Sequence, residues 1–231
     1  MDSKGLFITF EGGDGVGKST HLRFLGDVIE RHGVEVVRLR EPGGTSIGEE
    51  LRNVVLNPKN TEMCDECELL IYEAARAQIV AQTIRPALER GAVVLCDRFF
   101  DSTVAYQVYG RGLNKSFVEA ANLFATNGIV PDRTILITSG NTTENLERAT
   151  RRLGADRLEN AGADFHDDVN RSFLAIAQEN PDRFRVIDLQ PKKSLTSQCV
   201  FRALSDLFPW MADMADDPAQ FASLDVKKAV K

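Results

Sequence analysis

The chain has 231 residues, of which 43% are hydrophobic and 27% are charged. This composition is that of an ordinary globular protein and argues against wholly disordered, collagenous and disulfide-scaffold classes. Its 28 basic and 34 acidic side chains give a net charge of −6, without the basic excess of proteins that bind nucleic acids. No stretch approaches the roughly 20 apolar residues of a membrane span, and the N-terminus lacks the form of a signal peptide. We therefore expect a cytoplasmic protein that binds neither nucleic acid nor membrane.

Apolar runs and helical spacings alternate along the chain. They predict strands at residues 6–10, 34–39, 92–96, 133–138 and 184–189, and helices at 21–31, 47–56, 65–90, 116–125, 143–152, 165–179 and 194–207. Because the strands are nearly apolar throughout, they favour a parallel sheet that is covered on both faces. The predicted fold class is α/β: a three-layer sandwich with a central five-stranded parallel sheet flanked by helices.

No internal repeat, low-complexity segment or Pro/Ser-rich linker divides the chain. We therefore expect a single domain over residues 1–208. Residues 154–163 are rich in small and charged side chains between two predicted helices, so a lid at about 151–163 is the best candidate for a mobile segment. Residues 209–231 are interpreted as a weakly ordered tail or an appended helix with no assigned role.

Four cysteines are too few for disulfide bonds to stabilise a chain of this length, which favours a reducing compartment. Cys64 and Cys67 form a C-x-x-C pair, but neither a second pair nor a nearby H-x-x-x-H completes a tetrahedral zinc site. Incidental thiols beside a helix start are the favoured interpretation. The three histidines are far apart in sequence and are interpreted as structural or surface residues.

The strongest signal lies between the first predicted strand and the first predicted helix. It is the full GxxxxGK[ST] pattern, which consists of Gly12, Gly13, Asp14, Gly15, Val16, Gly17, Lys18 and Ser19 and is followed by Thr20. Glycines let backbone N–H groups turn inward around phosphate oxygens, and the following helix presents its positive end to the same anion. Lys18 is then expected at the β and γ phosphates, and the Ser19 hydroxyl at Mg²⁺. This phosphate loop, residues 12–19, predicts nucleotide binding but not the phosphate acceptor.

Asp97 and Arg98 follow directly after the third predicted strand. A carboxylate there can reach the outer shell of the metal, and an arginine can reach a phosphate. Standing alone, the pair would be explained equally well as a surface ion pair. The GTPase class is disfavoured, because residues 114–117 (Asn-Lys-Ser-Phe) fail the last position of the guanine-reading NKxD pattern.

Five segments together carry a resemblance to a known family. They are residues 10–20 (FEGGDGVGKST), 40–45 (REPGGT), 72–78 (YEAARAQ), 97–107 (DRFFDSTVAYQ) and the arginine-rich 148–159. With them the chain, over about residues 5–208, resembles thymidylate kinase, a nucleoside monophosphate kinase of the P-loop NTPase fold. The resemblance implies phosphate transfer from ATP·Mg²⁺ to dTMP in dTTP biosynthesis, a homodimer, and an acceptor-binding region at about residues 40–80.

The resemblance also implies an acceptor pocket. Arg76 resembles the arginine that reads thymine, because its donors suit the O4 acceptor and would meet the amino group of cytosine unfavourably. Tyr72, one helical turn earlier, resembles the aromatic residue that stacks on the base. The other implied positions are Asp14 at the sugar 3′-hydroxyl, Arg40 and Arg98 at the phosphate, Tyr106 near C2′, the lining residues Ser102, Thr103 and Gln107, and Pro42, whose peptide bond is cis in the family.

Catalysis is expected to come from positioning and charge cancellation, since the acceptor phosphate is already anionic and needs no strong base. The candidate catalytic residues are Lys18, Arg98, Asp14, Arg152 and Arg157, with Ser19 and Asp97 as Mg²⁺ ligands, directly or through water. Some family members carry an arginine where this chain has Gly15. The resemblance therefore implies that the catalytic arginine comes from the lid, on or beside which Arg148, Arg151, Arg152 and Arg157 lie. The choice among Arg151, Arg152 and Arg157 stays open. Phe99 stands where the family commonly has Tyr.

Two other functions stay open at this point. One is a kinase for another nucleotide or nucleoside, such as dUMP or UMP, although Tyr72, Arg76 and Tyr106 argue against it. The other is a non-metabolic P-loop regulatory ATPase, which would hydrolyse ATP without an acceptor.

Overall fold

The computed structural model describes residues 5–140, 144–145, 147, 156–159 and 161–226. Its centre is a parallel sheet with the strand order β2-β3-β1-β4-β5. The strands are β1 (Leu6–Glu11), β2 (Val36–Arg40), β3 (Val93–Asp97), β4 (Arg133–Thr138) and β5 (Phe184–Asp188). The predicted five-stranded parallel sheet is confirmed within the described part of the chain.

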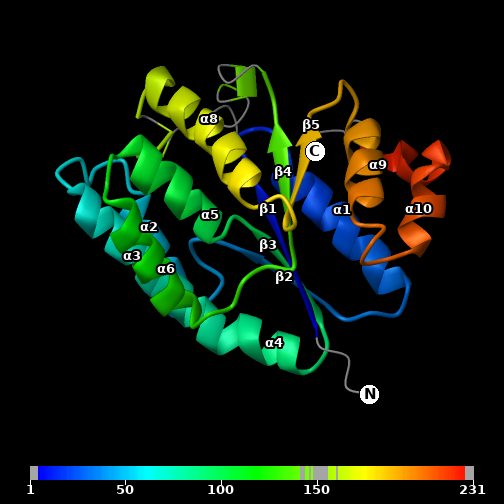
Figure 1. Cartoon of the computed structure of the whole chain (residues 1–231), viewed down its shortest axis with the longest axis horizontal. Coiled ribbons are helices and arrows are strands. Elements are labelled where there is room, and N and C mark those ends of the chain that lie inside the picture. The colour runs from blue at the N-terminus through cyan, green and yellow to red at the C-terminus, as the bar shows by residue number, and fades with distance from the viewer. Residues whose placement is uncertain (1–4, 141–143, 146, 148–155, 160, 227–231) are drawn as a thin grey trace.

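Helices cover both faces of the sheet (Figure 1). One face carries α1 (Lys18–Arg31), α9 (Lys193–Ala203) and α10 (Trp210–Ala215), and the other carries α2 (Ser46–Val55), α3 (Asp65–Ile79), α4 (Arg85–Glu89), α5 (Phe100–Thr103), α6 (Lys115–Thr126) and α8 (Ala163–Glu179). Successive strand side chains point to opposite faces, so Ile8 and Phe10 pack toward α1 while Phe7 packs toward α3 and α4. The result is the predicted α/β three-layer sandwich. Among the helices that the structure describes, none is both long and apolar enough to cross a membrane.

The strand order determines where ligands can bind. β1 lies between β3 and β4, so the chain places β2 and β3 on one side of β1 and then β4 and β5 on the other. Open α/β sheets bind ligands outside the carboxyl ends of the strands at such a switch point. The phosphate loop follows β1, and Arg98 follows β3, whose last residue Asp97 pairs with Phe10 of β1. The two motifs singled out from the sequence are therefore neighbours.

The predicted helix at 65–90 is interrupted. α3 passes into a π-helical turn, η1 (Val80–Ile84), before α4 begins at Arg85. Pro86 has no N–H to donate to the preceding turn, and the wider π turn accommodates its ring.

A further helix was not predicted from the sequence. α5 continues into a second π-helical segment, η2 (Val104–Gly110). Four consecutive residues of η2, 104–107, are buried. A helix buried on all sides has no amphipathic period, so its sequence gives no helical signal.

The predicted helix at 143–152 falls largely outside the described residues, and the predicted lid at 151–163 falls outside them in part. Residues 144, 145 and 147 are helical, and residues 157–159 form a turn. Arg148, Arg151 and Arg152 lie outside the described residues, so their predicted roles stay predictions.

The C-terminal segment is helical, as the second of its two interpretations expected, and it packs into the core rather than forming a weakly ordered tail. It comprises α10 and the 3-10 helix η3 (Pro218–Leu224), both of which contact α9. Phe221 is fully buried, with its ring centroid 5.5 Å from that of Phe24 and 5.1 Å from that of Phe201. Asp225 then accepts hydrogen bonds from the backbone N–H and the hydroxyl of Ser194, at 3.1 and 2.6 Å, at the start of α9. The folded unit therefore extends past residue 208.

Candidate active site

One cavity of about 880 Å³ runs along the carboxyl edge of the sheet. Its wall is formed by the phosphate loop, the segments after β2, β3 and β5, and residues of the turn 156–159. β2 and β5 are the two edge strands, so the cavity has a β5 end, beside Thr20, His21 and residues 189–193, and a β2 end, beside Tyr72 and Arg76. The phosphate loop lies between these ends, so the cavity can hold a donor and an acceptor together.

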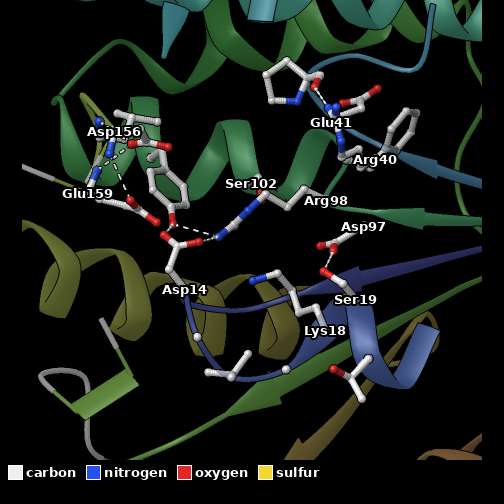
Figure 2. A pocket seen from close by; sticks show the side chains of 18 of the residues that line it. Asp14, Lys18, Ser19, Arg40, Glu41, Asp97, Arg98, Ser102, Asp156 and Glu159 are labelled. Carbon is white, nitrogen blue, oxygen red and sulfur yellow. Dashed lines mark hydrogen bonds and ion pairs between the residues drawn. The ribbon is translucent and has the colours of Figure 1, made fainter. Parts of the chain in front are cut away.

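Lys18 lies inside the phosphate loop. Its ammonium donates to the carbonyl oxygens of Gly12 at 2.9 Å and Gly13 at 2.7 Å, and only 6% of the residue is exposed. Burial and the nearby Arg98 guanidinium lower its pKa to about 8. The ammonium is therefore mostly charged at neutral pH, and Figure 2 shows it directed toward the open space beside Asp14.

Gly15 has no room for a side chain. Its φ is +77°, in the left-handed region that favours glycine. A Cβ atom there would lie 1.9 Å from the carbonyl oxygen of Asn145. An arginine at this position, as in some members of the family that the sequence resembles, does not fit this loop, so any further cation must come from another segment.

Ser19 and Asp97 meet beside the phosphate loop. The Ser19 hydroxyl donates to the Asp97 carboxylate (Figure 2). Within the ranges that the structure describes, no group of three or more His, Cys, Asp or Glu side chains could enclose a metal ion. Mg²⁺ commonly takes one or two protein oxygens while phosphates and water complete its shell. The Ser19 and Asp97 oxygens fit that requirement.

Arg98 connects the phosphate loop to the segment after β3. Its Nη2 donates to Asp14 Oδ1 at 2.5 Å and to the Tyr106 hydroxyl at 3.2 Å, and its Nη1 donates to Ser102 Oγ at 3.0 Å. The Tyr106 hydroxyl donates to Asp14 Oδ2 at 3.1 Å. Burial alone would raise the pKa of Asp14, but the charges of Arg98 and Lys18 outweigh it and hold that pKa well below its usual range. Asp14 is therefore an ionised carboxylate at the centre of the cavity (Figure 2).

Glu11 is a functional residue that sequence reasoning left without a role. Its carboxylate is fully buried and accepts the Phe99 N–H at 2.7 Å and the Ser102 hydroxyl at 2.6 Å. Burial, and secondarily the charge of Asp101, raise its pKa to about 8. Through these two hydrogen bonds Glu11 fixes the turn that follows Arg98. The available signal was its position, a charged residue that ends an apolar strand just before the phosphate loop.

Arg76 is enclosed at the β2 end of the cavity, with 1% of the residue exposed. Its Nε donates to Glu41 at 2.9 Å, and its Nη1 donates to Glu73 at 2.7 Å and to Asn122 at 2.9 Å. Burial raises the pKa of Glu41 to about 7 and also raises that of Glu73. These three partners were not found from the sequence, and they fix the plane of the guanidinium beside Tyr72.

The other predicted acceptor residues line the same cavity. They are Arg40, Pro42, Ser102, Thr103, Tyr106 and Gln107. The Glu41–Pro42 peptide bond is cis, as the resemblance implied. The Pro42 carbonyl accepts from Arg40 at 3.0 Å and from Arg52 at 2.9 Å. Arg52 also lines the cavity and was not predicted, because it lies outside the matched segments.

Arg157 is the one candidate lid arginine among the described residues. Its Nη2 donates to Glu68 and its Nε donates to the Val55 carbonyl oxygen at 2.9 Å. The side chain is 11% exposed. Arg157 is therefore bound to α3 and to the end of α2, and its neighbours Asp156, Leu158 and Glu159 line the cavity.

Comparison with known proteins gives one family. Residues 10–200 match the family model described as thymidylate kinase. The chain is 45% identical over 206 residues to the thymidylate kinase of Pelotomaculum thermopropionicum, which covers 88% of this chain and 94% of that protein. It is 42% identical over 207 residues to that of Alcanivorax borkumensis, with 89% and 99% covered. A crystal structure of thymidylate kinase from Ehrlichia chaffeensis matches with a TM-score of 0.72 at 32% identity, covering 87% of this chain and 98% of that one.

The buried carboxylate of Glu11 predicts a pH-dependent stability. Its pKa is about 8 in the folded protein against an ordinary value of 4.5, so its contribution to stability is present below pH 4.5 and is lost as the pH rises through 8. Glu11→Gln stays neutral and keeps an acceptor for Phe99. The variant should exceed the wild type in free energy of unfolding by on the order of 1–3 kcal/mol at pH 8, with a smaller gap at pH 5. Chemical denaturation at both pH values measures this, and a gap independent of pH would contradict it.

Proposed function

The chain belongs to the thymidylate kinase family, and we propose that its cavity transfers the γ-phosphate of ATP to dTMP, giving ADP and dTDP. Family membership makes it an ATP-dependent phosphotransferase. The position of Arg98 is the observation that supports separate donor and acceptor ends of the cavity. Arg98 joins Asp14 of the phosphate loop to Ser102 and Tyr106, which follow β3. One guanidinium therefore borders both halves of the cavity.

We assign the β5 end to ATP. The ATP-binding residues are Gly12, Gly13, Asp14, Gly15, Val16, Gly17, Lys18, Ser19 and Thr20, whose backbone N–H groups would surround the phosphates. Because Lys18 marks the place of the β and γ phosphates, the nucleoside would extend past Thr20 toward residues 189–193. Burial lowers the pKa of His21 to about 4, so this end of the cavity presents a neutral imidazole.

Ser19 and Asp97 are the proposed ligands of the Mg²⁺ that accompanies ATP, directly or through water. Bound there, the ion would neutralise charge on the β and γ phosphates. Their mutual hydrogen bond supports this role, because it directs both oxygens to one point beside the loop.

We assign the β2 end to dTMP. Glu41 is the partner of Arg76 Nη2, at 2.8 Å, and a second Nη2 hydrogen would donate to thymine O4. Since Glu41, Glu73 and Asn122 hold the guanidinium, it would have little freedom to turn away from a cytosine amino group. Tyr72 would stack on the base.

The sugar and phosphate of dTMP would then lie toward the phosphate loop. Asp14 would accept a hydrogen bond from the 3′-hydroxyl, and Tyr106, packed in the apolar cluster of η2 and α8, would fill the space near C2′. Arg40 and Arg98 would hold the phosphate, with Arg52 added to this group. Pro42, Ser102, Thr103 and Gln107 complete the pocket wall.

Catalysis is proposed to rest on in-line positioning and charge cancellation by Lys18 and Arg98. Asp14 fixes Arg98 from the other side at 2.5 Å. The sequence assigns a further cation to the lid. Arg152 keeps that role as a prediction, while Arg157 is the lid arginine whose contacts the structure describes.

The acceptor preference tests this function. ADP formation by the full chain with ATP and Mg²⁺ should be strongest with dTMP and weak with UMP, dCMP, AMP, thymidine or no acceptor, because Arg76 reads O4 of the base and Tyr106 disfavours a 2′-hydroxyl. Lys18→Ala, as the impaired control, should lower kcat by roughly 100-fold or more without loss of helical signal. ADP formation that is equal without acceptor, or strongest with another nucleotide, would contradict the assignment.

We also propose a cytoplasmic location. All four cysteines are free thiols. A reducing compartment keeps them in that state.

A homodimer is proposed through the outer surface of α3 and α6, two adjacent helices (Figure 1). On α6, Phe117, Leu123 and Phe124 are 58%, 64% and 86% exposed, and on α3, Leu70 is 56% exposed. A monomer seldom leaves so many large apolar side chains together in water. Pairing with the same surface of a second copy would bury them.

Charge placed on this surface should separate the two copies. Phe124→Asp should sediment as a monomer, because a carboxylate would be buried without a partner. Leu195→Asp is the matched control, since Leu195 is 40% exposed on α9, on the other face of the sheet. Analytical ultracentrifugation distinguishes the states. A dimeric Phe124→Asp, or a wild type that is monomeric at high concentration, would contradict the interface.

A further inference from the structure

Glu68 is a fully buried carboxylate in the first turn of α3. It accepts from Gln107 at 2.8 Å, from Arg111 at 3.2 and 3.1 Å, and from Arg157. Burial would raise the pKa of Glu68, but the hydrogen bonds from Arg111 and Gln107 outweigh it and lower that pKa. The carboxylate is therefore a charged anchor for two segments that are distant from it in sequence, the end of η2 and the turn at 156–159.

Arg157 differs from Arg111 in what it connects to this anchor. Its Nε donates to the Val55 carbonyl oxygen at 2.9 Å, and its backbone N–H donates to the Leu56 carbonyl oxygen at 3.2 Å. The turn at 156–159 is thereby attached to α3 through Glu68 and to the end of α2 through two carbonyl groups. Arg111 instead follows η2 and lies over the Phe165 ring, 4.7 Å from its centroid.

The attached turn is a wall of the acceptor end. Leu158 is 8% exposed and belongs to the apolar cluster that contains Tyr106 and contacts Tyr72. Glu159 lines the cavity, and Figure 2 shows its carboxylate directed toward Asp14. Inside the turn, Asp156 accepts the N–H groups of Leu158 and Glu159, each at 2.9 Å. These bonds brace the turn from within.

The contacts of the Arg157 guanidinium distinguish a catalytic cation from a residue that positions the acceptor wall. An arginine that cancels charge on a transferred phosphate needs donors free to reach the phosphate loop, whereas Nε and Nη2 of Arg157 are already bound to Val55 and Glu68. Glu68 also holds Gln107, a residue of the proposed dTMP pocket. The ion pair therefore acts on the acceptor wall.

We propose that Arg157 is a positioning residue whose ion pair with Glu68 holds residues 156–159 as a wall of the dTMP pocket. It sets the affinity for the nucleoside monophosphate and leaves the rate of phosphoryl transfer to other cations. This inference rests on the proposed function, since it assigns the β2 end of the cavity to dTMP.

Arg157→Lys and Arg111→Lys form a matched pair for the test. Both keep one positive charge near Glu68, but lysine cannot reproduce a fork that binds two acceptors at once. Steady-state kinetics with ATP and dTMP should show that Arg157→Lys raises KM for dTMP by about 10-fold or more, which is the loss of about 1.4 kcal/mol of binding. The variant should keep kcat and the KM for ATP within about threefold of the wild type. Arg111→Lys should leave all three parameters near the wild type.

Two results would overturn the inference. A fall in kcat of about 100-fold with an unchanged KM for dTMP would make Arg157 a catalytic cation. An equal rise in KM for Arg111→Lys would mean that Glu68 merely needs its charge balanced. A wild type without dTMP-dependent ADP formation would instead remove the proposed function itself.

A second variant keeps the test decisive if Arg157→Lys unfolds. Leu158→Ala leaves the ion pair in place but removes part of the wall beside Tyr72 and Tyr106. It should also raise the KM for dTMP while sparing kcat. An unchanged KM would show that the turn does not border bound dTMP and would overturn the inference.

Discussion

The site depends on a single residue in an unfavourable backbone conformation. Arg98 has a φ of +68°, a region that costs a residue with a side chain roughly 1–2 kcal/mol. Its backbone N–H donates to the Phe10 carbonyl oxygen at 2.9 Å, and its guanidinium contacts Asp14, Ser102 and Tyr106. These bonds stabilise the turn and direct the side chain into the cavity. The phosphate loop and the acceptor wall are therefore joined through one side chain.

The charges around this turn explain how an acidic protein can bind two anions. The chain carries a net charge of −6, yet Lys18 and Arg98 converge at the middle of the cavity, and Arg40 and Arg52 lie at its β2 end. Asp14 is paired with Arg98, and the raised pKa of Glu11, about 8, keeps that carboxyl group protonated at neutral pH. Fixed positive charge in a partly enclosed site stabilises charge that develops on a transferred phosphate without reorganisation.

The sequence was sufficient for the layers of the fold and for residues that lie within one motif. Strands that are apolar on both faces indicate a covered parallel sheet. The spacing of the phosphate-loop motif identifies Lys18 and Ser19 without further information. What it could not supply were partners drawn from distant segments. Glu41 and Asn122 come from two other parts of the chain and meet only around Arg76. Such contacts leave no periodic pattern.

A helix was one of the two interpretations of the C-terminal segment, but its packing into the core was not predicted. Residues 209–226 mix apolar residues with four aspartates, and this mixture does not show that Met211, Ala215 and Phe221 are fully buried. Met211 and Ala215 have helical spacing, but α10 has only six residues, too few for the period to show whether the helix packs on the core.

The Arg98 guanidinium joins the donor and acceptor halves of the cavity, and the variant Arg98→Lys tests this most directly. Lysine keeps the charge but cannot hold Asp14, Ser102 and Tyr106 together. Steady-state turnover of ATP and dTMP should then fall by roughly 100-fold or more, while circular dichroism shows an intact fold. Turnover within about threefold of the wild type would show that a point charge suffices and would contradict this account.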